Sequence, residues 1–257
     1  MKRIQDCPVS RILWLNEASF ILELIVPEEI PTLLPGQFAE IRIDNTQEVF
    51  LRRPLSFLDV DYTNRKIRFF IKVIGRGTRQ LGRLQPGMPV NIIYPLGNHF
   101  SLPEQGRALI VGGGSGIAPF IILGRELQKK GIAMTFLLGG KQHKDILMMD
   151  TFRQFGEVLI TTEDGSLGEE GLVTQHPVFH QDHFDFTMVY ACGPEPMMKA
   201  VASIAAKKGI PCEVSLENLM ACGFGVCLCC VVGTTMGNQC VCTDGPVFNI
   251  THLKWQI

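Results

Sequence analysis

The sequence predicts a multi-domain chain: an antiparallel β-barrel, then a doubly wound α/β domain with a parallel sheet, then a small cysteine-rich domain. We place these units at residues 1–100, 101–212 and 213–257. Three observations predict this order. Residues 1–100 contain short runs of β-branched and aromatic residues separated by turns. Residues 101–212 alternate strand and helix patterns, and six of the nine cysteines follow residue 221.

The composition is that of a globular protein and excludes several classes of function. The 257 residues carry 24 lysines and arginines against 25 acidic residues, so charge gives no reason to expect nucleic acid or an anionic membrane as a partner. No apolar run reaches the roughly 18 to 20 residues of a membrane span, and residues 1–20 lack the pattern of a secretion signal. We therefore expect a cytoplasmic protein with unbridged cysteines.

Four segments of the first hundred residues have the pattern of strands. Several alternate apolar with polar residues, and the breaks between them are rich in proline, glycine and other residues that favour turns. Many short strands with little helix are typical of an antiparallel barrel or sandwich. The expected strands are 12–15, 20–26, 38–43 and 67–74.

Two segments of the barrel contain residues suited to a phosphate. Arg53 precedes Pro54, Leu55 and Ser56, and arginine can bind phosphate oxygens through two parallel hydrogen bonds. Residues 72–78 end a strand in a glycine-rich turn, whose amides could cradle a phosphate. Each pattern alone has a simpler interpretation, because an arginine at a strand end is usually solvated and Gly-x-Gly is usually a turn.

The second hundred residues alternate strands with helices. This alternation predicts a doubly wound parallel sheet, which binds ligands at the carboxyl ends of its strands. Two glycine-containing segments, 112–116 and 192–196, lie at that edge. The expected strands are 107–111, 133–138, 157–161 and 186–191, and the expected helices are 117–131, 145–155 and 197–209.

The glycine segment 112–116 does not match the common dinucleotide fingerprint. G-x-G-x-x-G needs a small residue where Ile117 and Pro119 stand. A strand, a glycine turn and a helix start still offer free amides and a positive dipole to a phosphate, although a tight strand-to-helix turn is the simpler interpretation. No acidic residue follows the next strand, where residues 139–141 are Gly-Gly-Lys, so these residues do not separate NAD from NADP.

The cysteine-rich segment has the spacing of a metal site. Cys222, Cys227 and Cys230 form a C-x4-C-x2-C pattern, which plant-type 2Fe–2S sites use with a fourth cysteine further on. A disulfide-bonded loop is disfavoured in a protein that is not exported. Four thiolates also suit structural zinc, but zinc ribbons usually show paired C-x2-C segments. The spacing therefore favours iron–sulfur over zinc.

The order of these motifs resembles the ferredoxin–NADP reductase superfamily of flavoproteins. The motifs are Arg-Pro-x-Ser and Gly-x-Gly-Thr, followed by Gly-Gly-Gly-Ser-Gly-Ile-Ala-Pro and Cys-Gly-Pro. The resemblance implies FAD on the barrel and a nicotinamide nucleotide on the α/β domain. For FAD it implies Arg53, Pro54, Leu55, Ser56, Ile71, Lys72, Val73, Gly75, Gly77 and Thr78, and for the nucleotide Gly113, Gly114, Ser115, Gly116, Cys192, Gly193 and Pro194.

Segments 215–227 and 242–248 resemble the electron-transfer subunits of the NAD-dependent, two-subunit dihydroorotate dehydrogenases, and the resemblance then spans nearly the whole chain. These segments read SLENLMACGFGVC and CTDGPVF. The resemblance implies that a 2Fe–2S cluster is held by Cys222, Cys227, Cys230 and Cys242. Cys229 and Cys240 depart from that pattern, and we interpret them as bystanders that pack or donate weak hydrogen bonds.

The same resemblance implies a partner and a place in pyrimidine biosynthesis. The partner would be an FMN-containing catalytic subunit that oxidises dihydroorotate, in a heterotetramer with two copies of each chain. Electrons would pass from partner FMN through the 2Fe–2S cluster and FAD to NAD. The flavin connects the two-electron chemistry of nicotinamide with the one-electron chemistry of the cluster, and Ser56 would hydrogen-bond it.

No residue of this chain is assigned as catalytic. The histidines are scattered, and no Ser-His-Asp or metal-binding histidine spacing occurs. Cys192 either stands beside the nicotinamide or is a small buried residue at a strand end. Two alternatives stay open: a reductase subunit of another complex, of the sulfite reductase, hydrogenase or NADH–ferredoxin transhydrogenase type, or a zinc-stabilised binding module without flavin.

Overall fold

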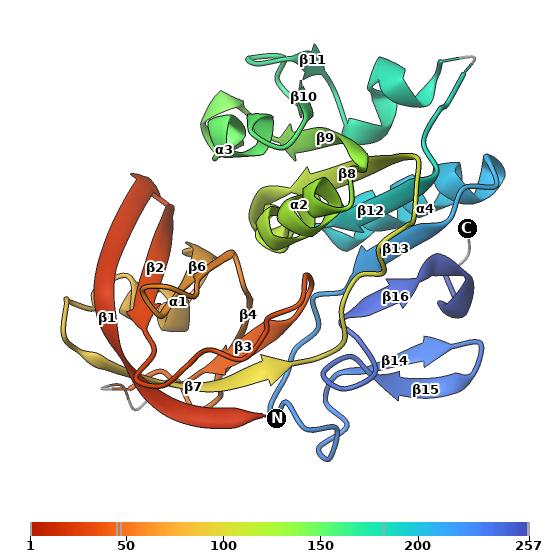
Figure 1. The fold of residues 1–257 in the computed structure, drawn as a ribbon. Helices are drawn as coiled ribbons and strands as arrows, with labels where there is room; N and C mark the ends of the chain where they lie inside the picture. Colours follow the sequence, from red (N-terminus) through yellow and green to blue (C-terminus); the bar gives the residue numbers. More distant parts are fainter. Residues whose placement is uncertain (1, 45, 47, 182, 256–257) are drawn as a thin grey trace.

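The computed structural model describes residues 2–44, 46, 48–181 and 183–255. Their strands form two seven-stranded sheets and one two-stranded sheet. A curled N-terminal sheet lies beside a second sheet flanked by helices, and a C-terminal hairpin lies close to both (Figure 1). Within these ranges, no helix is both long and apolar enough to cross a membrane.

The N-terminal sheet is antiparallel and curled, as the sequence predicts. Its strands run in the order β4-β3-β7-β1-β2-β6-β5. The predicted strand 12–15 is the end of a much longer strand, because residues 3–8 pair with β7 although charged residues and Pro8 obscure their pattern. The elements are β1 (Arg3–Asn16), β2 (Ser19–Ile25), β3 (Phe38–Ile41), β4 (Arg53–Ser56), β5 (Asp59–Asp61), β6 (Lys66–Lys72), α1 (Arg76–Leu81) and β7 (Pro89–Leu96).

The second sheet is doubly wound and runs in the order β11-β10-β9-β8-β12-β13-β16. Side chains of β8 alternate between its faces: Leu109 and Val111 pack in the core that contains α4, and Ala108 and Ile110 pack in the core that contains α2. The strands are β8 (Arg107–Gly113), β9 (Ala133–Gly140), β10 (Glu157–Thr162), β11 (Glu169–Glu170), β12 (Met188–Cys192), β13 (Cys212–Ser215) and β16 (Val247–Asn249).

Three α-helices accompany this sheet: α2 (Phe120–Lys129), α3 (Met149–Arg153) and α4 (Glu195–Lys207). The helix predicted for 117–131 begins later, after a 3-10 turn at Gly114–Ile117, since Pro119 suits only the first turn of an α-helix. The prediction of a helix over 145–155 is wrong at both ends. Only Met149–Arg153 is α-helical, because Met148 has a left-handed backbone with φ of 61°.

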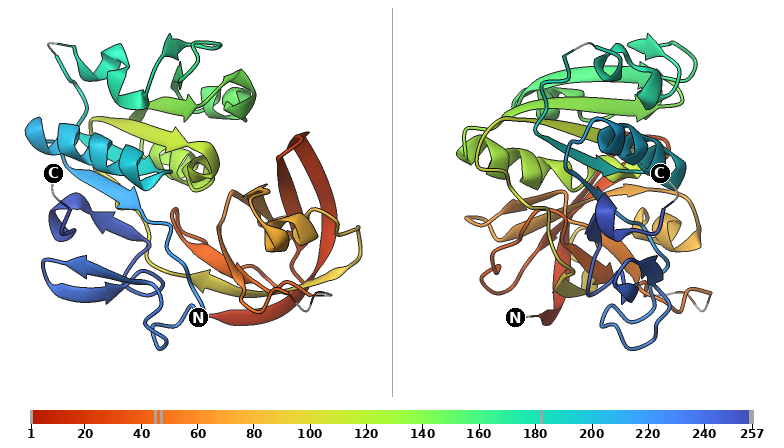
Figure 2. Two further views of the ribbon diagram at one scale, coloured as in Figure 1. Left: turned by 180° about the vertical axis from the view of Figure 1, so that it is seen from behind. Right: turned by 90° about the vertical axis from the view of Figure 1, so that its right-hand side faces the viewer.

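The C-terminal segment packs against both larger units. Hairpin β14 (Val231–Thr234) and β15 (Gly237–Cys240) forms the small sheet, while β16 pairs antiparallel with β13 at the edge of the second sheet. One buried core contains Phe38 of β3, Val214 of β13 and the cysteines at 230 and 242. The segment lies beneath the second sheet in both views of Figure 2. The predicted ranges 101–212 and 213–257 meet inside β13.

An ion-pair chain crosses from the curled sheet to α2. Glu23 is almost fully buried, and Arg68 Nε lies 2.7 Å from its carboxylate. The same arginine binds Asp59 at 2.7 Å, and Arg125 of α2 also binds Asp59. Burial alone would raise the pKa of Glu23, but hydrogen bonds from Arg68 and Lys66 hold it at about 2.

Candidate functional site

A cavity of about 470 Å³ opens at the carboxyl ends of β8, β9, β10 and β12. The chain leaves β8 towards β9 on one side and leaves β12 towards β13 on the other, so this is the point where strand order reverses. We call it the sheet-edge cavity. Its lining residues are Lys72, Gly113, Gly114, Gly139, Gly140, Lys141, Gln142, Asp145, Thr161, Glu163, Gly171, Leu172, Val173, Thr174, Pro194, Pro196, Met197 and Ala200.

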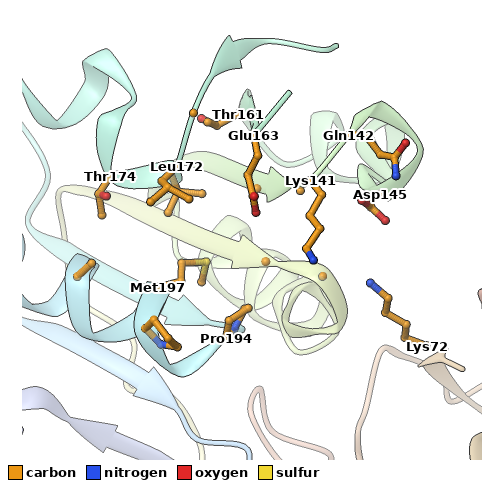
Figure 3. Close-up of a pocket in the computed structure, with 18 residues that line it drawn as sticks. Lys72, Lys141, Gln142, Asp145, Thr161, Glu163, Leu172, Thr174, Pro194 and Met197 are labelled. Atoms are coloured by element: carbon orange, nitrogen blue, oxygen red, sulfur yellow. The ribbon is translucent and has the colours of Figure 1, made fainter. Parts of the chain in front are cut away.

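Three charged side chains extend into the sheet-edge cavity from different elements. Figure 3 shows Lys141 after β9, Glu163 after β10 and Lys72 from the end of β6 directed towards its middle. Lys72 belongs to the curled sheet, so this cavity is formed by both domains. Two ammonium groups facing one space suit an anionic ligand, and the Glu163 carboxylate suits a hydroxyl-bearing one.

A second cavity of about 360 Å³ lies against the curled sheet, and we call it the barrel cavity. Lys72 lines both cavities, which makes it a shared wall between them. Ser115 also lies here, on the barrel side of the glycine segment. The lining residues are Phe38, Arg53, Pro54, Leu55, Ser56, Phe70, Ile71, Lys72, Ile74, Thr78, Ser115, Ala118, Ser215, Leu216, Glu217, Asn218, Leu219, Met220 and Pro246.

The predicted glycine-rich turn at 75–77 is instead the start of α1. Thr78 Oγ1 accepts hydrogen bonds from the amides of Ile74 and Gly75, at 3.0 and 3.2 Å, so these amides already have a partner. Gly77 leaves room for Arg53, because a Cβ there would lie 2.8 Å from Arg53 Nε. The helix start therefore positions the arginine at the barrel cavity.

The two glycine-containing segments of the α/β domain pack backbone against backbone. A Cβ at Gly116 would overlap the Cys192 carbonyl and lie 2.5 Å from the nitrogen of Gly193. A Cβ at Gly113 would lie 2.8 Å from Met197 Sδ. Cys192 is 2 % exposed, and burial raises its pKa well above the ordinary value. Gly113 lines the sheet-edge cavity, and Gly116 and Cys192 support it from behind.

Four cysteines of the C-terminal segment lie close together in twos. Cys227 is among the groups that lower the pKa of Cys222, and the amide of Cys242 donates to Cys230 Sγ at 3.4 Å. We call Cys222 with Cys227, and Cys230 with Cys242, the cysteine pairs. Across the ranges that the structure covers, no three candidate ligands converge on one metal position. A single zinc requires four ligands around one centre, whereas a two-iron cluster uses four thiolates spread over two metals. The C-x4-C-x2-C spacing of Cys222, Cys227 and Cys230, together with Cys242, fits the four thiolates of a 2Fe–2S cluster.

Backbone amides of the loop point at these sulfurs. Phe224 donates to Cys222 Sγ at 3.3 Å, and Gly225 donates to Cys242 Sγ at 3.2 Å. Gly225 has φ of 77°, a conformation that favours glycine. The Phe224 amide is the main reason that the pKa of Cys222 falls to about 6, which favours the metal-binding thiolate.

The two remaining cysteines of the segment differ in burial. Cys229 is exposed, whereas Cys240 is 8 % exposed and its thiol lies 3.8 Å from the Gly225 carbonyl. Their interpretation as bystanders stays a prediction.

Glu40 lies under the cysteine loop on β3. It is completely buried, and within the described part of the chain neither carboxylate oxygen has a hydrogen-bond partner. A Cβ on Gly223 would lie 3.1 Å from Glu40 Cγ. Burial raises the pKa of Glu40 to about 7, while the nearby charge of Arg52 acts in the opposite direction.

Comparisons with known proteins agree with this geometry. Residues 217–254 match the iron-sulfur cluster binding domain of dihydroorotate dehydrogenase B, and residues 110–203 match an oxidoreductase NAD-binding domain. The "Dihydroorotate dehydrogenase B (NAD(+)), electron transfer subunit" of Desulforamulus reducens is 35% identical over 100% of both chains. The chain belongs to this family. A Caldanaerobacter subterraneus protein of the same name is 40% identical over 83% of this chain and 84% of its own.

Solved structures show the same fold. A structure described as an NADH-dependent reduced ferredoxin-NADP oxidoreductase, studied for flavin-based electron bifurcation, is 30% identical with a TM-score of 0.88, covering 97% of this chain and 90% of that chain. The ferredoxin reductase of carbazole 1,9a-dioxygenase is 20% identical with a TM-score of 0.69, over 82% and 67% of the two chains. At this identity, the carbazole dioxygenase reductase supports the fold assignment and nothing further.

These findings confirm the main sequence predictions. The chain is an electron-transfer subunit of the dihydroorotate dehydrogenase B family, and the predicted cofactors FAD, 2Fe–2S and NAD are confirmed, as is the ferredoxin-reductase-like fold. The name implies a catalytic partner subunit. The roles of individual site residues stay predictions.

Sequence reasoning missed several residues of the two cavities. Glu163 could have been found by applying the strand-end rule to the third strand, since it directly follows β10. Lys141 was named only because it stands where an acidic residue would have separated NAD from NADP. Residues 215–220 line the barrel cavity because β13 directs them there, and no local pattern signals this.

Proposed function

We propose that this chain carries electrons between the FMN of a catalytic subunit and NAD, in the oxidation of dihydroorotate for pyrimidine biosynthesis. When bound, FAD exchanges a hydride with NAD and single electrons with the 2Fe–2S cluster. Residues 1–100 hold FAD, 101–212 hold NAD and 213–257 hold the cluster. The observation that carries the proposal is the pair of adjoining cavities, with Cys230 and Cys242 in a core that shares Phe38 with the lining of the barrel cavity.

The barrel cavity provides the groups that FAD needs. Arg53 offers a guanidinium to the pyrophosphate, and Pro54 fixes the backbone beside it. The Ser56 hydroxyl lies in the same cavity and hydrogen-bonds the flavin ring. The remaining predicted contacts, among them Ile71 and Thr78, lie in or beside this cavity.

The sheet-edge cavity suits NAD. The glycines at 113 and 114 let the nucleotide approach the backbone, and Pro194 lines the cavity beside Gly113. Lys141 supplies a positive charge for the pyrophosphate. Glu163 accepts hydrogen bonds from the ribose hydroxyls and repels an added 2′-phosphate, which favours NAD over NADP. No acidic residue follows β9, the second strand of the α/β domain. Glu163, which follows the third strand β10, takes that role.

Cys222, Cys227, Cys230 and Cys242 would hold the cluster, which would supply one-electron transfer. The amide donors of the loop stabilise the thiolates, and the exposed position of Cys227 places the cluster near the surface. Because all nine cysteines are free, we assign the chain to a reducing compartment, the cytoplasm.

The catalytic subunit docks on the cysteine loop. Exposed apolar side chains occur on the loop and near it in sequence, and exposed apolar patches mark interaction sites. Docking there brings a partner FMN close to the cluster, in a heterotetramer of two copies of each chain. The exposed apolar residues are Leu219, Phe224, Val226, Leu228 and Met236.

Co-purification tests this proposal. The tagged chain is expressed with an untagged FMN-containing dihydroorotate dehydrogenase subunit, and the complex is assayed for NADH formation from dihydroorotate. We expect a yellow-brown complex with FAD, iron and sulfide that reduces NAD+. A complex that reduces NAD+ only with reduced ferredoxin would assign the chain to the bifurcating type of its structural relative. A colourless chain with stoichiometric zinc would refute the proposal.

A further inference from the structure

Glu40 occupies the wall between the barrel cavity and the cysteine loop. Side chains alternate along β3: Ala39 and Ile41 pack inside the curled sheet, whereas Phe38 belongs to the core that contains two of the proposed ligands. Glu40 is on the face of Phe38, and a Cβ on Gly223 would lie 3.7 Å from its Oε1. Since Phe38 lines the barrel cavity, this face of β3 separates the FAD site from the cluster site.

The Glu40 carboxylate has no ion-pair partner among the described residues. Arg52 directs one guanidinium nitrogen to the carbonyl oxygens of Glu40 and Asn91, at 3.3 and 3.1 Å. Arg53 directs its guanidinium to the carbonyl of Leu51 at 2.8 Å. Arg52 also binds the Asn91 side chain, and Arg53 lines the barrel cavity, so neither guanidinium is bonded to the Glu40 carboxylate. A buried carboxylate without a partner costs free energy, so packing does not account for it.

We infer that Glu40 sets the reduction potential of the cluster, an inference that rests on the proposed function. In its ionised form, the Glu40 carboxylate places a negative charge in a water-excluded wall, and this charge disfavours the arrival of an electron nearby because Coulomb interactions weaken less there than in water. The potential of an iron–sulfur cluster follows the charges and burial around it. By keeping the cluster potential low, Glu40 favours passage of each electron onward to FAD.

Redox titration of the complex with its catalytic subunit, followed by electron paramagnetic resonance of the reduced cluster, tests this inference. Glu40→Gln removes the charge and keeps the shape, and Glu40→Leu removes the polar group. Glu28→Gln is the matched control, because it removes a carboxylate of the same domain, in the loop after β2, whose side chain is 68% exposed. Iron, sulfide and FAD contents are measured for every variant.

We expect both Glu40 variants to retain the cluster and to show a more positive reduction potential, while Glu28→Gln matches the parent. An unchanged potential in a fully loaded Glu40→Gln protein would overturn the inference. Loss of iron from both Glu40 variants would also overturn it, because Glu40 would then hold the loop. Absence of a 2Fe–2S signal from the parent protein would instead refute the proposed function.

Discussion

Gly116→Ala should displace the Cys192–Gly193 backbone, which supports the sheet-edge cavity on the side away from its opening. The new Cβ would lie 2.5 Å from the Gly193 nitrogen, whereas ordinary contacts begin at 3.4 Å. The obstacle is backbone, so no side chain can rotate away; the Gly193 nitrogen must move by about 0.9 Å (3.4 minus 2.5 Å), and the closer Cys192 carbonyl must move further. Overpacking of this kind costs about 1–3 kcal/mol of stability. A displacement near 1 Å at a reacting centre costs about 100-fold in rate.

The assay is NADH oxidation by the FAD-loaded chain with ferricyanide as electron acceptor. We expect kcat/KM for NADH to fall by about 100-fold, with FAD and iron contents unchanged. Gly131→Ala is the matched control: Gly131 has φ of 73° and open space around its Cβ position, so alanine there costs stability without touching the cavity. If Gly116→Ala kept the kcat/KM of Gly131→Ala, the packing of these two segments would not position the nucleotide.

Three further predictions concern charge and thiols. Glu163→Ser should lower the preference for NADH over NADPH by at least about tenfold in kcat/KM, and an unchanged ratio would remove Glu163 from nucleotide selection. Burial opposes ionisation of Glu23, but Arg68 lowers its pKa from 4.5 to about 2. The folded state should therefore lose stability as pH falls from 4.5 towards 2 in acid-denaturation experiments, and Glu23→Gln should flatten this dependence. In cluster-free protein, mass spectrometry should find Cys227 alkylated by iodoacetamide before buried Cys192; equal rates would contradict the described burial.

The parts of the fold whose apolar residues follow a regular local pattern were predictable from sequence. Strands such as β2 and β6 alternate or are continuously apolar, and the strand–glycine–helix order of residues 107–129 reports a parallel sheet directly. The β1 strand was underestimated because Pro8 and several charged residues interrupt its pattern, although its backbone pairs along β7. The short α3 could not be predicted, because a left-handed Met148 is set by tertiary packing.

The candidate site was predictable where residues close in sequence act together. The cysteine spacing and Arg53-Pro54-Leu55-Ser56 are examples. Residues that only the topology brings together were not predicted. Glu163 reaches the sheet-edge cavity only because β10 lies beyond β9, and Glu40 reaches the cysteine loop only because that loop packs on β3. The antiparallel return of β16 to the second sheet likewise has no local signal.

The central claim is that the cysteine pairs connect a partner flavin to the FAD of this chain. Cys227→Ser, assayed anaerobically in complex with the catalytic subunit, tests it most directly. We predict loss of 2Fe–2S absorbance and of NADH formation from dihydroorotate, with NADH–ferricyanide activity retained because FAD and the sheet-edge cavity are untouched. Full cluster content together with parental NADH formation from dihydroorotate would contradict the account.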